Sequence, residues 1–174
     1  VEDNMYFATP KTMEWIEKLK QESKKNGTVG CVVLDKQGNL TAGTSTGGMF
    51  KKRWGRIGDS PVIGAGTYAD NNSCAVSCTG HGEYFIRHAV AFDVCARYKY
   101  LKESVEKAAD YIIHTELNTN AGNGGLIAVD KLGNIAMPYN SGGMFRGFLY
   151  KEKGRPEIKK GCGIGKKIVV VGEK

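Results

Sequence analysis

The sequence lacks the cysteine spacing of a metal or redox centre. It contains five cysteines, an odd number, and none of them forms a Cys-x-x-Cys pair. This pattern excludes the usual structural zinc sites and thioredoxin-like centres. The three histidines form no metal-ligand cluster either, so we expect no bound metal. We expect the cysteine side chains to behave as small buried apolar groups in a reducing compartment, which indicates a cytoplasmic protein. They are Cys31, Cys74, Cys78, Cys95 and Cys162.

Long apolar runs are also missing. The longest aliphatic run, Ile168–Val171, is far too short to span a bilayer, and we see no signal peptide. A net charge of +7 raises the question of nucleic acid, but residues 151–174 hold eight basic and three acidic residues and so carry +5 of it. Beyond Tyr150 no aromatic residue is interleaved with these basic residues, so no base-stacking surface is indicated. We expect a basic, solvated tail, with neither membrane nor nucleic-acid binding.

What the sequence does contain is the length and apolar content of one globular domain. With 174 residues, of which 41% are hydrophobic, it can bury a substantial core. Thr9-Pro10 has the residues of a helix start, an apolar stripe runs from Met13 to Leu19 at helical spacing, and Asn26-Gly27 marks a stop. A helix is therefore predicted to end just before Thr28.

The most informative internal feature is a repeat. Residues 28–50 align without gaps with residues 123–145, and both copies contain an apolar strand, an Asp-Lys-x-Gly-Asn turn, a return strand and Gly-Gly-Met-Phe. Each copy predicts a β-hairpin. Two copies are too few for a solenoid, so they indicate matched hairpins in a layered β core.

Between the hairpins the pattern predicts two strands and then two helices. The strands are expected at Pro61–Tyr68 and Asn72–Thr79. The first helix carries an i, i+4 row from Ile86 to Tyr98, and the second has Ser104 as its N-cap. This order predicts an α+β fold in which helices cover sheets. The apolar face of the second helix consists of Val105, Ala108, Ala109, Ile112 and Ile113.

Five segments, taken in order, resemble one family. They are GTVGCVVLD from Gly27, TSTGGM from Thr44, GRIGDSPVIGAGTYAD from Gly55, SCTGHGE from Ser77 and GGLIAVDKLGNIAMPYNSGGM from Gly124. Together they are similar to the β-subunit of plant-type L-asparaginases/isoaspartyl peptidases, which are N-terminal nucleophile hydrolases. Each segment alone is weak evidence, but their joint occurrence in this order is specific.

The resemblance implies how the chain is organised. VEDNMYF at the start is similar to the end of the family's α-subunit, and the match continues to about Tyr150, after which the family's usual ending is not found. Residues 1–27 would be the end of the α-subunit with a pre-cleavage helix, residues 28–150 the catalytic β-subunit, and residues 151–174 a basic C-terminal tail. The implied fold is a four-layer αββα sandwich, present here as roughly its C-terminal half.

In this family the precursor cuts itself immediately before a threonine, which the resemblance places at the Gly27-Thr28 bond. A threonine hydroxyl needs a base, and the free α-amine that the cut creates can accept its proton at neutral pH. Glycine at position 27 allows backbone strain that helps the hydroxyl reach the preceding carbonyl. The alternative is that Asn26-Gly27 only caps a helix and that Thr28 is an ordinary strand residue.

Three further side chains gain roles from the resemblance. Thr46 would orient the nucleophile through its hydroxyl, although Thr46-Gly47-Gly48 is also typical of a turn. Arg56 and Asp59, three residues apart, would hold the α-carboxylate and the α-ammonium of the substrate. Taken alone, such a pair is usually a surface ion pair.

Thr79 and Gly80 follow an apolar strand and precede a helix, where a hydroxyl and a backbone N–H can converge on an oxyanion. The resemblance assigns them this role and places the backbone of Gly82 against the substrate. A glycine-rich strand-to-helix turn would need the same glycines and remains the alternative. His81 lies in this motif where relatives commonly carry a smaller or different residue, and we expect it to face solvent.

The implied reaction is acyl transfer. Thr28 Oγ would attack the side-chain amide of L-asparagine or the isopeptide bond of a β-aspartyl dipeptide, ammonia or an amino acid would leave, and water would hydrolyse the ester. No cofactor is expected in this chain, with a structural monovalent cation in the missing α-subunit portion as an option. The implied partners are that α-subunit portion and a second αβ unit in a homodimer. Two alternatives stay open: a glycosylasparaginase-like amidase, and a non-catalytic fragment or pseudoenzyme that acts only as an assembly partner.

Overall fold

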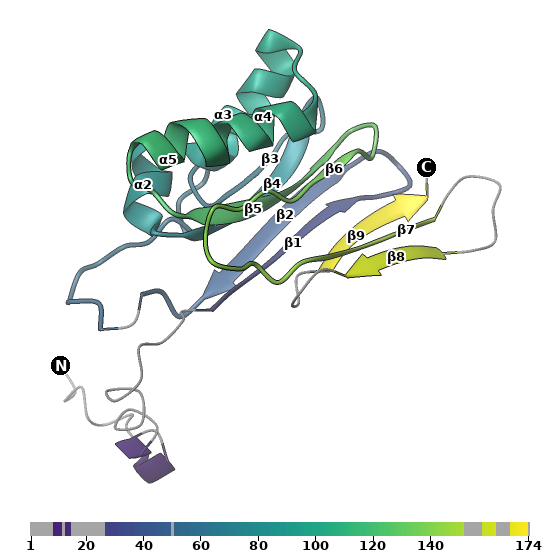
Figure 1. The fold of residues 1–174 in the computed structure, drawn as a ribbon. Helices are drawn as coiled ribbons and strands as arrows, with labels where there is room; N and C mark the ends of the chain where they lie inside the picture. The colour runs from purple at the N-terminus through teal and green to yellow at the C-terminus, as the bar shows by residue number, and fades with distance from the viewer. Residues whose placement is uncertain are drawn as a thin grey trace.

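The computed structural model describes residues 9–11, 13–14, 27–49, 51–151, 158–162 and 168–173, with side chains up to residue 150. These residues build two sheets and one group of helices (Figure 1). Of the helix predicted from Thr9 onward, only the first turn is described, where Met13 N donates to Thr9 O (2.9 Å). The remainder of that helix, including most of its apolar stripe, and the VEDNMYF segment lie outside the described residues.

The first sheet has five strands in the order β2-β1-β9-β7-β8. β1 and β2 form an antiparallel hairpin, in which Thr28 is opposite Thr46. β9 runs parallel to both β1 and β7 and so joins the hairpin to the rest of the sheet. The bounds are Thr28–Leu34 for β1, Leu40–Thr46 for β2, Gly147–Lys151 for β7, Ile158–Cys162 for β8 and Ile168–Glu173 for β9.

The C-terminal segment differs from its prediction as a solvated basic tail. β8 and β9 both lie within residues 151–174, and β9 contributes the backbone pairs Val33↔Val170 and Leu34↔Val171. The physical reason is the aliphatic run at 168–171, because continuous runs of Val and Ile are typical of strands paired on both sides. Positive charge elsewhere in the segment does not prevent this backbone pairing.

The second sheet has four antiparallel strands in the order β3-β4-β5-β6. Its central pair keeps one register from Cys74↔Asp130 to Gly80↔Gly124. The strand predicted at Asn72–Thr79 is therefore confirmed with a shift of one or two residues. The bounds are Thr67–Ala69 for β3, Cys74–Gly80 for β4, Gly124–Asp130 for β5 and Ile135–Ala136 for β6.

The strand predicted at Pro61–Tyr68 is mostly wrong. Only its last residues belong to β3, and the chain before them folds back on itself in tight turns. Val62 N and Gly66 N both donate to Asp59 O, at 3.0 and 3.1 Å, and Ala65 N donates to Val62 O at 3.0 Å. These local bonds hold the segment as a compact loop because they occupy donors that a strand would present to a neighbour.

The two copies of the sequence repeat form matching turns, which confirms the predicted hairpins. Asp35 accepts hydrogen bonds from the backbone N–H and side-chain amide of Asn39, at 2.7 and 2.8 Å. Asp130 accepts the same two bonds from Asn134, both at 2.8 Å. The second hairpin has a shorter return strand, because Pro138 cannot donate to a ladder. The carbonyl of Pro138 instead accepts a hydrogen bond from Leu126 N at 3.1 Å.

The two aspartates provide a matched test of burial. Asp130 is 1% exposed, whereas Asp35 is half-buried and its bonds are open to solvent. Asp130→Ala leaves the part-buried donors of Leu132 and Asn134 without their acceptor, so we expect the free energy of unfolding to fall by about 2 kcal/mol. Asp35→Ala should lower the urea midpoint by a smaller amount, because water replaces the lost acceptor. Equal midpoints for the two variants would contradict this account.

The first predicted helix is divided by a break. α2 (Gly82–Arg87) ends where Ala89 takes a left-handed conformation (φ 44°), and α3 (Val90–Ala96) then continues into the π-helical segment η1 (Arg97–Leu101). The first turn of α3 donates to the 59–66 loop: Ala91 N binds Ala65 O at 3.1 Å and Phe92 N binds Gly64 O at 2.8 Å. Tertiary bonds thus cap α3 where sequence periodicity predicts one continuous helix.

The second predicted helix is confirmed. It comprises α4 (Val105–Tyr111), η2 (Ile112–Glu116) and α5 (Leu117–Thr119), which follow one another directly. Ser104 is its N-cap and accepts a hydrogen bond from Lys107 N at 3.2 Å. All five residues predicted for its apolar face are fully buried. None of the described helices is long and apolar enough to cross a bilayer.

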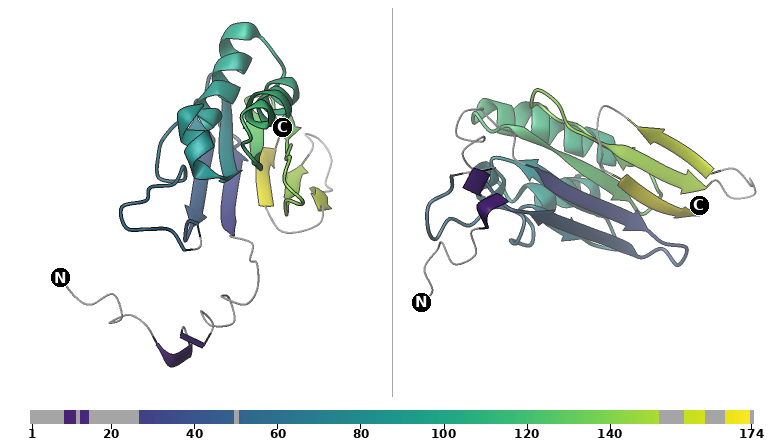
Figure 2. Two further views of the ribbon diagram at one scale, coloured as in Figure 1. Left: turned by 60° about the vertical axis from the view of Figure 1, so that its left-hand side comes forward. Right: turned by 90° about the horizontal axis from the view of Figure 1, so that it is seen from below.

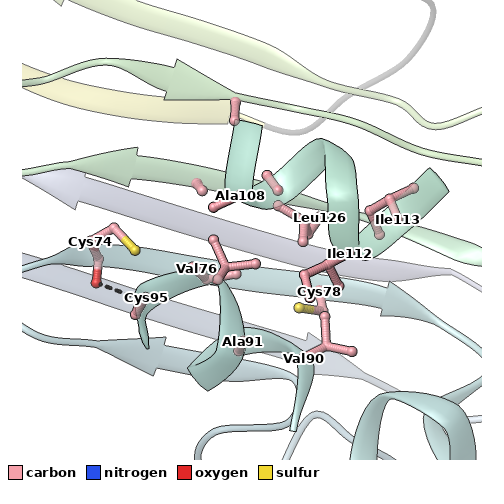
Figure 3. Packing of buried hydrophobic residues seen from close by; sticks show 14 of the residues in the cluster. Cys74, Val76, Cys78, Val90, Ala91, Cys95, Ala108, Ile112, Ile113 and Leu126 are labelled. Carbon is pink, nitrogen blue, oxygen red and sulfur yellow. Dashed lines mark hydrogen bonds between the residues drawn. The ribbon is translucent and has the colours of Figure 1, made fainter. Parts of the chain in front are cut away.

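Two buried clusters hold the elements together, and they confirm the α+β class. The helices lie over one face of the β3–β6 sheet (Figure 2), and one cluster of side chains joins them to that face (Figure 3). The other joins the opposite face of that sheet to the β1-β2 hairpin through residues such as Val32, Ile127 and Val129. A fully buried side chain of this size contributes about 1.5–3 kcal/mol. Three of the cysteines, Cys74, Cys78 and Cys95, lie in the first cluster as predicted, and Cys95 Sγ donates to Cys74 O at 3.2 Å.

Candidate active site

Antiparallel pairing brings two hydroxyls together at one end of the β1-β2 hairpin. Thr28 begins β1 and lies opposite Thr46 at the end of β2. Thr28 Oγ1 donates to Thr46 Oγ1 at 3.3 Å, and Thr46 Oγ1 donates in turn to Gly27 O at 3.0 Å. Gly48 N donates to Thr46 Oγ1 at 3.0 Å. The Thr46 hydroxyl therefore links the Thr28 hydroxyl to the carbonyl that precedes it.

This arrangement can polarise one peptide bond. A hydroxyl that donates to a carbonyl oxygen stabilises negative charge that develops there during attack on the carbonyl carbon. Gly27 and Thr28 are joined in the structure, so the nitrogen of Thr28 is a peptide N–H and cannot serve as a base. The geometry thus combines a carbonyl, a neighbouring hydroxyl and a donor to the carbonyl oxygen.

A pocket of about 190 Å³ opens beside the two threonines. Its wall combines the hydroxyls of two threonines with charged side chains of both signs, so it suits a small polar molecule. No three His, Cys, Asp or Glu side chains of the described residues gather where they could hold a metal ion. The residues that line the pocket are Thr28, Thr46, Gly47, Gly48, Met49, Lys52, Arg56, Gly58, Asp59, Gly80 and His81.

Arg56 lines the pocket and is held by the carboxylate of Glu83. Its Nε and NH2 groups donate to Oε1 and Oε2 of Glu83 at 2.8 and 3.2 Å. The pair raises the pKa of Arg56 and lowers the pKa of Glu83, in each case chiefly through this hydrogen bond. The charge of Asp59, whose side chain is only 6% exposed, raises the pKa of Arg56 further. Arg56 therefore stays a cation within the pocket wall.

Glycines let the backbone close around Asp59. A Cβ on Gly66 would lie 2.6 Å from Asp59 O, and a Cβ on Gly82 would lie 2.8 Å from Asp59 Oδ1. Real Cβ atoms do not approach so closely, so any side chain at either position would displace the carboxylate or the loop. The requirement for glycine at Gly66 and Gly82 is therefore steric.

A network of hydroxyls lies beneath the site. Thr44 Oγ1 and Ser77 Oγ are 2.7 Å apart, and Thr67 Oγ1 donates to Thr44 Oγ1. These residues come from β2, β4 and β3, so the network joins the two sheets below Thr46. Ser77 is fully buried, and its part-buried bond to Thr44 ties down the strand that carries Thr46.

A family model described as asparaginase matches residues 3–157. The chain belongs to this asparaginase family. It is 54% identical over 129 residues to the isoaspartyl peptidase of Salmonella typhimurium, which covers 74% of this chain and 41% of that protein. It is also 49% identical over 143 residues to the isoaspartyl peptidase of Escherichia coli, covering 76% of this chain and 44% of that protein.

A plant relative gives a similar match. The chain is 53% identical over 120 residues to the probable isoaspartyl peptidase/L-asparaginase 2 of Arabidopsis thaliana, covering 69% of this chain and 36% of that protein. The chain thus spans well under half the length of these asparaginase-family relatives.

The structure brings five of the predicted site residues of this asparaginase-family chain to one pocket. Thr28, Thr46, Arg56, Asp59 and Gly80 all line it. These residues lie far apart in the sequence. They are brought to one pocket by the β1-β2 hairpin, the 59–66 loop and the end of β4.

The other three predicted site residues, Gly27, Thr79 and Gly82, are not among the residues that line the pocket. Gly27 contributes the carbonyl that accepts from Thr46 Oγ1. Thr79 is half-buried in β4, where its backbone pairs with Gly125. Gly82 begins α2 and packs against Asp59. His81 is solvent-exposed as predicted, but it also lines the pocket, which the prediction did not include.

Two charged residues of the site, Lys52 and Glu83, have no predicted role from the sequence. Lys52 lines the pocket and donates through Nζ to Gly47 O at 2.8 Å, while Glu83 holds the guanidinium of Arg56. Glu83 belongs to the SCTGHGE segment, and its position in the first turn of a helix that follows a glycine-rich turn was the available signal. For Lys52 the signal was its spacing of four residues before Arg56.

Proposed function

We propose that this chain is the catalytic half of a threonine amidohydrolase that cuts its own Gly27-Thr28 bond. After the cut it hydrolyses L-asparagine, β-aspartyl dipeptides or both. The observation that carries the proposal is the hydrogen-bonded set of Gly27, Thr28 and Thr46 beside a pocket that contains a fixed cation. The names of the relatives, isoaspartyl peptidase and probable isoaspartyl peptidase/L-asparaginase, support the substrate class.

The cut begins with attack by Thr28 Oγ1 on the carbonyl carbon of Gly27. Negative charge develops on Gly27 O, which accepts the hydrogen bond from Thr46 at 3.0 Å. The proton of Thr28 Oγ1 passes to the backbone nitrogen of Thr28 as this intermediate collapses, which breaks the Gly27-Thr28 C–N bond and leaves Gly27 as an ester on Thr28. Water then hydrolyses the ester, and the products are a Gly27 carboxylate and a free α-amine on Thr28.

The freed amine supplies the base for the second reaction. It accepts the proton of Thr28 Oγ1, which attacks the side-chain amide carbon of the substrate. Arg56 binds the α-carboxylate of the substrate and Asp59 its α-ammonium. The Gly80 N–H and the Thr79 hydroxyl stabilise the oxyanion. Ammonia or an amino acid leaves, and water releases aspartate from the ester.

Thr46→Val tests the first reaction. The variant keeps the shape of the side chain but cannot donate to Gly27 O, so we expect cleavage to slow by roughly 10²-fold. Intact-mass spectrometry over time measures the fragment that begins at Thr28. Thr41→Val is the matched control, because Thr41 is an exposed residue of the same strand, and it should cleave at the wild-type rate. Unchanged cleavage in Thr46→Val would contradict the role of this hydroxyl.

The proposed partner is the α-subunit portion that the family resemblance implies. The outward face of β1 supports this proposal, because Val29 is 60% exposed there and Cys31 and Val33 are half-buried. In the proposed assembly that portion covers this face, completes a four-layer αββα sandwich and provides any monovalent-cation site. Two such αβ units would form a homodimer.

An ammonia-release assay with and without an added α-subunit portion tests the whole proposal. We expect release from asparagine only after the new terminus at Thr28 has appeared by intact mass. A chain that stays uncut after long incubation with the added portion would favour the non-catalytic alternative. Steady hydrolysis of a glycosylated asparagine would favour the amidase alternative instead.

A further inference from the structure

Glu83 meets Arg56 through two parallel hydrogen bonds. Oε1 accepts from Nε at 2.8 Å and Oε2 accepts from NH2 at 3.2 Å, so the carboxylate and the guanidinium lie edge to edge. The Arg56 side chain is 16% exposed and that of Glu83 is 49% exposed. Glu83 therefore binds from the solvent side and leaves the inner side of Arg56 to the pocket.

The glycines around the guanidinium limit its remaining freedom. A Cβ on Gly58 would lie 2.7 Å from Arg56 NH1, and one on Gly82 would lie 3.1 Å from NH2. The guanidinium thus lies closely against two glycine segments of the backbone, which limit the space around NH1 and NH2.

The pairing decides which donors remain for a ligand. A guanidinium has five N–H donors in a planar fork, and Glu83 uses one on Nε and one on NH2. One N–H of NH1 and the second N–H of NH2 form the adjacent edge, which matches a second carboxylate bidentately, and the other N–H of NH1 points to the Cδ side. NH1 lies 3.5 Å from the Cβ position of Gly48, a pocket-lining residue. That edge therefore belongs to the pocket side.

We propose that Glu83 is a positioning residue that sets the orientation of Arg56 for the substrate α-carboxylate. The inference rests on the proposed function, because it assumes that Arg56 binds this carboxylate. Glu83 itself does not touch the substrate in this account. Its role is to hold two donors of the guanidinium so that the other edge is presented at a fixed angle.

The test compares two amides that differ only in the α-carboxylate. L-Asparagine has this group, and 3-aminopropanamide is the same molecule without it. In Glu83→Ala, assayed after cleavage and with the α-subunit portion supplied, we expect kcat/KM for asparagine to fall roughly 10- to 100-fold, mainly through KM. The value for 3-aminopropanamide should stay within about threefold of wild type, because the substrate offers nothing for Arg56 to bind. Glu83→Gln keeps the side-chain length and should lie between Glu83→Ala and wild type.

Two controls separate positioning from damage to the fold. Glu106→Ala removes another first-turn glutamate, at the start of α4, and should leave both substrates unchanged. Cleavage before Thr28 should proceed normally in Glu83→Ala, because that reaction uses no substrate carboxylate. Equal losses for the two amides would overturn the proposal in favour of a structural role, and so would no loss for either.

If the wild-type chain hydrolyses neither amide, that result counts against the proposed function alone. The role of Glu83 is then tested by measuring ligand binding. Titration calorimetry then compares L-aspartate with β-alanine, which is aspartate without its α-carboxylate. Glu83→Ala should weaken L-aspartate by roughly tenfold or more and leave β-alanine unchanged. A variant that holds L-aspartate as tightly as wild type would overturn the positioning role.

Discussion

Replacing Thr28 with alanine is expected to abolish both proposed reactions. Without the hydroxyl there is no attack on Gly27, so the peptide bond stays intact and no amine is freed. Hydrolysis of asparagine should fall by roughly 10⁴-fold or more, as is usual when a covalent nucleophile is removed. Intact mass measures the first loss, and ammonia release in the presence of the α-subunit portion measures the second.

Two further variants test whether the loss of activity is due to the missing hydroxyl of Thr28. Thr28→Ser retains a hydroxyl at the same position and should keep both reactions at reduced rates. Thr41→Ala removes a threonine from the exposed side of β2 and should keep wild-type rates. Wild-type ammonia release by Thr28→Ala would disprove the assignment of the nucleophile, whatever the state of the chain.

The second large effect is predicted for Gly80→Ala. A Cβ at this position would lie 2.4 Å from Asn123 O and 2.6 Å from Phe85 Cε2. Gly80 is paired with Gly124 at the end of the two central strands, so neither backbone can retreat without breaking the register. We expect the free energy of unfolding to fall by about 3 kcal/mol or more and hydrolysis to be lost with it. Urea unfolding measures the first effect.

Gly43→Ala is the control for this prediction. Gly43 also lies in a strand, but a Cβ there would have nothing within 4 Å. Its free energy of unfolding should change by no more than about 0.5 kcal/mol. If Gly80→Ala unfolded at the same urea concentration as Gly43→Ala, the close packing of β4 and β5 would not be the reason for glycine at position 80.

Features with a local cause could be predicted from the sequence. The turns at Asp35 and Asp130 follow from aspartate and asparagine side chains that bond to their own backbone, and the Ser104 cap follows from one hydroxyl and one nearby N–H. The opposition of Thr28 and Thr46 also follows, because the turn fixes the register of a hairpin. These features needed no knowledge of the rest of the chain.

Features that depend on contacts with distant parts of the chain could not be predicted from the sequence. The α2-α3 break depends on the bonds of Ala91 and Phe92 with the 59–66 loop, which no local pattern shows. Ile86 was placed on the predicted apolar row, yet it is 36% exposed because the break changes the face that α2 buries. Glu83 belongs to the same class, since its partner Arg56 is 27 residues earlier in the chain.

The openness of the pocket has an electrostatic consequence. The hydrogen bonds among Gly27, Thr28 and Thr46 are exposed, so water screens the local field with a high effective dielectric constant. The interaction of two charges 4 Å apart rises from about 1 kcal/mol in bulk water to about 4 kcal/mol near a protein surface. A substrate or a covering segment that displaces this water therefore strengthens the electrostatic attraction between Arg56 and an anion, even if Arg56 itself does not move.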